Sequence, residues 1–129
     1  MRIEHIAIYC KDLEAMRNFY ENYFDGKSNE KYVNAKKGFE SYFISFTDGA
    51  RLELMRMVNI PDSKNNIYEQ FTGLIHFAVS VGSKEKVDEL TEKFRNDGIE
   101  IIGEPRWTGD GYYESVILDI EGNRIEITI

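Results

Sequence analysis

The sequence predicts an α+β fold of tandem βαβββ modules, in which curved mixed sheets enclose a cavity and the helices lie outside. Three segments recur at a shift of 71 to 73 positions: a strand-like start, a helix-like stretch closed by Asp-Gly, and an Arg-Glu strand after a turn. The pairs are 3–8 with 74–79, 13–26 with 85–98, and 48–54 with 121–127. The chain therefore contains two copies of one module.

Each module has the same predicted order of elements. Alternating apolar residues predict strands at 2–9, about 29–34, 40–47 and 51–58, and again at 74–81, about 99–103, 112–119 and 124–128. Helical spacing of apolar residues follows Asp12 and Ser83, which can serve as N-caps. We expect Gly26 and Gly98 to end these helices in the left-handed conformation.

Composition limits the classes of function. A chain of 129 residues with 42% hydrophobic residues fits one domain, 1–129, made of module 1 (about 1–58), a linker (about 59–72) and module 2 (about 73–129). The net charge of −7 argues against a nucleic-acid partner. No window approaches the roughly 20 apolar residues of a membrane span. The single Cys10 and the absence of an export signal predict a cytoplasmic protein.

The only two histidines of the chain, with two glutamates, occupy equivalent positions of the two modules. They are His5 and Glu53 in the first module, and His76 and Glu126 in the second. Strand alternation places all four on one face of their strands. The aliphatic residues occupy the opposite face, which must pack against the helices. Two carboxylates that converge in an enclosed hollow repel each other, and a divalent metal removes that penalty.

Two imidazoles and two carboxylates suit one Zn, Ni, Co, Mn or Fe ion. Beside such an ion, Glu53 and Glu126 are candidate catalytic bases that take a proton from carbon. In the alternative interpretation, each Glu pairs with an Arg on a solvated strand and each His is an ordinary strand residue. Four residues of ligand type at matched positions favour the metal site.

Several cationic and aromatic residues are candidates for contact with a small-molecule substrate. Arg51, Arg56 and Arg106 can bind a substrate carboxylate, although for each of them a surface cation is the commoner role. Trp107 and Tyr112 lie on either side of a glycine-rich turn. They can form an aromatic wall or lid over the hollow, or pack at a sheet edge.

The pattern resembles the vicinal oxygen chelate superfamily, which includes glyoxalase I, extradiol dioxygenases and bleomycin-binding proteins. The resemblance lies in segments 3–7, 73–79 and 118–127, and the last of these is similar to the family ending D-P-[DE]-G-[NH]-x-[IL]-E, with Ile120 in place of Pro. In glyoxalase I the metal ligands lie on the first and last strand of each module. The resemblance therefore implies His5, Glu53, His76 and Glu126 as ligands. It also implies a homodimer, in which two ligands can come from each chain.

The resemblance implies two alternative functions. The first is a divalent-metal-dependent lyase or isomerase of glyoxalase type, acting by proton abstraction next to a carbonyl, as lactoylglutathione lyase does. The fourth, acidic ligand favours this branch, because the epimerases of the superfamily normally have Gln where Glu53 stands. The alternative is a non-enzymatic protein that sequesters a small molecule, as the bleomycin-resistance members do. Those members normally lack the four ligands.

Overall fold

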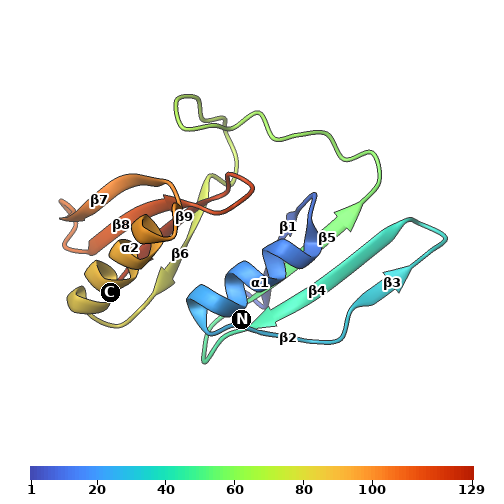
Figure 1. The fold of residues 1–129 in the computed structure, drawn as a ribbon, viewed down its shortest axis with the longest axis horizontal. Helices are drawn as coiled ribbons and strands as arrows, with labels where there is room; N and C mark the ends of the chain where they lie inside the picture. The colour runs from blue at the N-terminus through green and yellow to red at the C-terminus, as the bar shows by residue number, and fades with distance from the viewer. The chain divides into compact units, whose positions relative to one another are not determined.

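The computed structural model describes residues 1–129, and their contacts divide the chain into two units, Met1–Asp62 and Ser63–Ile129. Each unit consists of one mixed sheet with one helix packed against it (Figure 1), which confirms the α+β class. The second unit has the predicted βαβββ order, and the first has the same order with one additional short strand. Neither helix is long and apolar enough to cross a membrane.

The first sheet has the strand order β1-β5-β4-β2, with β3 also paired to β4. Its strands are β1 (His5–Tyr9), β2 (Lys27–Ser28), β3 (Tyr32–Asn34), β4 (Phe39–Ser45) and β5 (Arg51–Met57). Only β1 and β5 run parallel. The single strand predicted near 29–34 is in fact two short strands, because β2 and β3 pair with opposite ends of β4.

The second sheet repeats this topology in the order β6-β9-β8-β7. Its strands are β6 (His76–Ser80), β7 (Ile101–Trp107), β8 (Tyr113–Leu118) and β9 (Arg124–Thr128). Again the first and last strands of the unit, β6 and β9, are parallel neighbours, whereas the other pairs are antiparallel. Duplication has therefore preserved the one pairing that joins the beginning of each module to its end.

The helices cover the aliphatic faces of the sheets. Helix α1 (Leu13–Phe24) is capped by Asp12, whose side chain accepts a hydrogen bond from the Ala15 amide. Helix α2 (Lys84–Asn96) is capped in the same way by Ser83. The residues buried between helices and sheets are Leu13, Met16, Phe19, Tyr20, Tyr42, Ile44, Leu52 and Leu54 in the first unit, and Val87, Thr91, Phe94, Ser115, Ile117, Ile125 and Ile127 in the second.

The two Asp-Gly helix ends have different conformations. In α2 the glycine is left-handed as expected, with φ +79° at Gly98. In α1 the prediction is wrong: the left-handed residue is Asp25, with φ 52°. Gly26 is needed for a different reason, since a Cβ at this position would lie 2.5 Å from Cγ2 of Ile44. A side chain at this position therefore requires Ile44 of β4 to shift.

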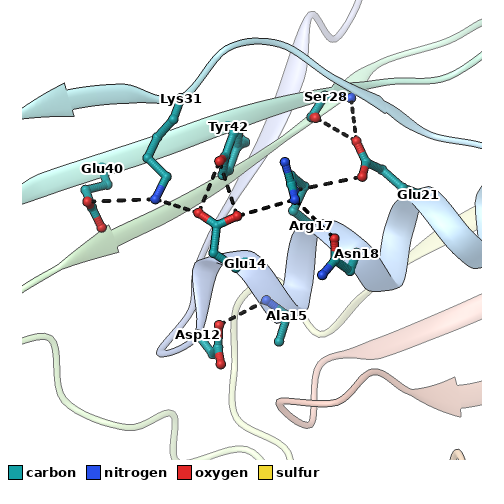
Figure 2. A network of polar contacts seen from close by, with 10 residues as sticks. All are labelled: Asp12, Glu14, Ala15, Arg17, Asn18, Glu21, Ser28, Lys31, Glu40 and Tyr42. Atoms are coloured by element: carbon teal, nitrogen blue, oxygen red, sulfur yellow. Dashed lines mark hydrogen bonds and ion pairs between the residues drawn. The ribbon is translucent and has the colours of Figure 1, made fainter.

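A polar network fixes α1 to the first sheet on its helix side (Figure 2). The Tyr42 hydroxyl donates to the Glu14 carboxylate at 3.1 Å, and the Lys31 ammonium lies 2.5 Å from the same carboxylate. Hydrogen bonding to Lys31 is the main cause that lowers the pKa of Glu14. Because Tyr42 alternates with Phe43 along β4, this network lies on the face opposite the candidate site.

Candidate functional site

Parallel pairing of the first and last strands brings the predicted ligands together in each unit. In the first unit His5 pairs with Arg51 and Ala7 pairs with Glu53. The second unit repeats this register, with His76 opposite Arg124 and Ala78 opposite Glu126. The small alanine opposite each glutamate leaves the carboxylate free to approach the imidazole of the neighbouring strand. We call the sheet face that carries the His and the Glu of a unit its site face.

The two His-Glu pairs have similar geometry. Nε2 of His5 lies 3.8 Å from Oε2 of Glu53, and Nε2 of His76 lies 3.2 Å from Oε2 of Glu126. The glutamates are mostly covered, with side-chain exposures of 15% and 21%, whereas the imidazoles are 39% and 38% exposed. Each unit therefore presents one nitrogen and one carboxylate ligand of the type that borderline divalent metals prefer.

Glu4 is a neighbour of the candidate site that was not among the residues predicted from the sequence. Its carboxylate accepts a hydrogen bond from Nδ1 of His5, and its other oxygen accepts one from Nε of Arg51 at 2.8 Å. The bond to His5 is the main cause that lowers the pKa of Glu4. A carboxylate at Nδ1 fixes the ring orientation with Nε2 on the side of Glu53, as the outer partners of metal-bound histidines do.

The site face of the first unit is otherwise largely apolar. The Phe43 ring packs edge-on against His5, with 5.3 Å between the ring centroids. The Arg51 guanidinium lies over the same ring, 4.1 Å from its centroid. Phe39, Met55 and Met57 are half-buried on this face by their register in β4 and β5. This surface can contact the apolar part of a small molecule.

The site face of the second unit is more polar, and it carries an additional acid. Glu114 is only 13% exposed, and its carboxylate pairs with the Arg106 guanidinium at 3.3 Å. Burial raises the pKa of Glu114, and repulsion from Glu126 adds to this effect. The alternation of β8 could have placed Glu114 on the face of Glu126. Its pairing with Arg106 depends on the register of β7, which the sequence does not indicate.

The other predicted substrate contacts are dispersed. Arg56 alternates with Glu53 along β5 and pairs with Glu40, so it lies on the helix side of the first sheet. Trp107 packs on Tyr113, whose hydroxyl donates to Asp88 of α2. Tyr112 is exposed in the turn between β7 and β8, where its amide donates to the Thr108 hydroxyl. Packing at a sheet edge is the arrangement observed for Trp107.

The donor atoms in each unit fit one half of a metal site. Each pair consists of an imidazole nitrogen and a carboxylate oxygen on the same face, without a thiolate. No group of three or more His, Cys, Asp or Glu side chains in the structure could hold a metal ion. The donor chemistry of both pairs agrees with the ions predicted from the sequence.

Comparison with known proteins identifies the family. The model for the Glyoxalase/Bleomycin resistance protein/Dioxygenase superfamily matches residues 2–127. The uncharacterized protein YqjT of Bacillus subtilis is 26% identical over 128 residues, covering 97% of this chain and 96% of YqjT.

Two solved structures share the fold. The glyoxalase family protein of Enterococcus faecalis has a TM-score of 0.80 at 22% identity, covering 99% of this chain and 97% of that one. Glyoxalase I of Zea mays has a TM-score of 0.78 at 22% identity, with 98% of this chain matching only 44% of that chain. The chain belongs to the Glyoxalase/Bleomycin resistance protein/Dioxygenase superfamily.

Proposed function

We propose that this protein is a divalent-metal-dependent lyase or isomerase of glyoxalase type, which abstracts a proton next to the carbonyl of a small molecule. The observation that carries the proposal is the matched pair of His-Glu contacts, His5 with Glu53 and His76 with Glu126, at equivalent registers of two sheets. Duplication alone explains matched positions. It does not explain why both copies retained an acid and an imidazole in contact.

In this proposal the four side chains act together as the ligands of one metal ion per site. Zn, Ni, Co, Mn or Fe would suit two imidazoles and two carboxylates. The two pairs would come either from the same chain or from two chains of a homodimer. Symmetric dimers are the commonest oligomers, and a dimer in which each chain supplies one pair would contain two equivalent sites.

The proposed chemistry divides between the metal and the protein. A bound divalent ion would polarise the substrate carbonyl and stabilise the negative charge that develops on its oxygen. Glu53 or Glu126 would take the proton from the neighbouring carbon, and the same carboxylic acid would return it to the adjacent carbon. Both glutamates are mostly covered yet lie on the site face beside an imidazole, so each could meet a substrate bound there.

The second candidate is a protein that binds a small molecule without converting it. The apolar surface of Phe39, Phe43, Met55 and Met57 on the first site face favours this function. The two candidates differ in their need for metal, because an apolar surface binds its ligand through burial alone.

Metal content per chain is the first test. The protein would be purified gently, analysed for metals, stripped by chelation and reloaded separately with Ni, Co, Zn and Mn. We expect about one equivalent per site, restored with a preference among the ions. The His76→Ala variant should lose tight metal binding while its circular dichroism stays unchanged. Unchanged metal retention in that variant would refute the ligand assignment.

The reaction is tested separately on the loaded protein. Hemithioacetals and acyl-CoA epimers would be incubated in D₂O and monitored by ¹H NMR for loss of the proton next to the carbonyl. Metal-dependent exchange that disappears in Glu53→Gln or Glu126→Gln would support proton abstraction. Binding of small apolar molecules with no metal under any loading would favour the sequestration function instead.

A further inference from the structure

The two modules contain equivalent arginines whose surroundings differ. Arg51 and Arg124 occupy the same repeat position, each paired with the histidine of its unit and two residues before the glutamate. Both therefore lie on their site faces, because the intervening Leu52 and Ile125 point into the core. The repeat therefore allows the two arginines to be compared. The charge of Arg51 is neutralised within the protein, and the charge of Arg124 is not.

Arg51 is held from two sides. Its guanidinium donates to the Glu4 carboxylate, with Nε 2.8 Å from Oε1, and it lies 4.1 Å from the centroid of the Phe43 ring. Glu4 in turn bonds His5. Arg51 thus takes part in positioning a predicted ligand, and its charge is already paired.

Arg124 has neither partner. Ile75 stands where Glu4 stands in the first module, and Val116 stands opposite Glu126 where Phe43 stands opposite Glu53. Six arginines lie in the helices and strands, and five of them form ion pairs: Arg17, Arg51, Arg56, Arg95 and Arg106. Arg124, half-buried beside His76, forms no ion pair in a protein of net charge −7.

We propose that Arg124 binds a carboxylate group of the substrate, while other oxygens of the same substrate bind the metal beside His76 and Glu126. This inference rests on the proposed function and adds the substrate class, a small carbonyl compound with a carboxylate. A guanidinium offers two parallel donors that match a carboxylate. The single positive charge of Arg124, which no acid of the protein pairs, balances a single negative charge on the substrate. A phosphate would carry nearly two charges and would require more donors than this face provides.

The test compares probes that differ only in a carboxylate. Benzohydroxamate chelates divalent ions through two vicinal oxygens, and its 3-carboxy and 4-carboxy derivatives add the anion at two positions. Their affinities for the Co²⁺-loaded full chain would be measured by isothermal titration calorimetry. We expect the better carboxy derivative to bind at least about tenfold more tightly than benzohydroxamate, since hydrogen bonds to charged groups are the stronger ones.

Three variants define the role of Arg124. In Arg124→Gln the advantage of the carboxy derivative should disappear, while the affinity for benzohydroxamate and the metal content stay as in the wild type. Arg124→Lys should keep part of the advantage, because the charge remains without the planar donor pair. Arg95→Gln removes an equal charge from α2, where Arg95 pairs with Glu92 and Glu104, and should keep the full advantage.

The outcomes separate the two proposals. If all probes bind the loaded protein but the carboxylate gives no advantage, or if the advantage persists in Arg124→Gln, the role of Arg124 is refuted and the metal site stands. If Arg95→Gln loses as much as Arg124→Gln, the effect is one of net charge, and the specific contact is refuted. If no probe binds the loaded protein, the proposed function fails, and the assignment of Arg124 fails with it.

Discussion

Replacing Glu4 by alanine should weaken metal binding although Glu4 is not itself a predicted ligand. Its carboxylate receives the hydrogen bond from Nδ1 of His5 and also holds Arg51 at 2.8 Å. Without Glu4 the imidazole can rotate, and its proton can move to Nε2, the nitrogen that faces Glu53. The His5 imidazole would then lose conformational entropy each time it binds the metal.

The structure sets the size of the effect. Removing the outer partner of a metal-bound histidine typically lowers metal affinity about 10- to 100-fold. Glu4 is 54% exposed and His5 is 39% exposed, so water can replace part of the lost hydrogen bond. We therefore expect a loss near the lower end, about tenfold, and a smaller loss for Glu4→Gln, which keeps a hydrogen-bond acceptor.

Competition with a chelator for Co²⁺ would measure the change. The matched control is Glu40→Ala, which removes the same charge from the same sheet but from its helix side, where Glu40 pairs with Arg56. Equal losses of affinity in Glu4→Ala and Glu40→Ala would show that only net charge matters. Unchanged affinity in Glu4→Ala would refute the positioning role.

Two further predictions concern the packing of α1. Gly26→Ala should destabilise the protein by about 1–3 kcal/mol in urea unfolding, because its Cβ would lie 2.5 Å from Ile44. The penalty should shrink when Ile44→Ala is also present, and an equal penalty in both backgrounds would contradict the steric cause. Hydrogen bonding to Lys31 lowers the pKa of Glu14, so its contribution to stability is present above the unfolded pKa near 4.5 and is lost as pH falls through the lower folded pKa. Glu14→Gln should therefore be less stable than the wild type at pH 7, and the difference should vanish in acid; a difference independent of pH would exclude this linkage.

The fold was predictable because the same pattern occurs twice. Strand alternation, two N-caps and a shift of 71 to 73 positions indicate the βαβββ order from the sequence alone. The split of one strand into β2 and β3 was not predictable, because both are short and are defined by their pairing with β4. The Asp-Gly signal was also ambiguous: it marked the end of both helices but not which residue is left-handed.

The candidate site was predictable only in part. Alternation determines which face a side chain occupies, and this was enough to place His5 and Glu53 on one face of their module and His76 and Glu126 on one face of theirs. Pairing partners depend on register between distant strands, which alternation does not encode. For this reason the pairing of Glu114 with Arg106 was missed. Glu4 was missed for another reason, because an acid at an exposed strand start has no apolar pattern to reveal it.

The repeat and its exceptions indicate different parts of the function. Features present in both modules, the His, the Glu and the small Ala opposite it, belong to what the two halves do in common, which we propose is metal binding. Features present in only one module make the two halves unlike. Glu4 and Phe43 hold Arg51 in the first unit, and their replacement by Ile75 and Val116 leaves Arg124 without a counterion in the second. A duplicated site that bound only metal would have no need for this difference, whereas an asymmetric substrate would require two unlike halves.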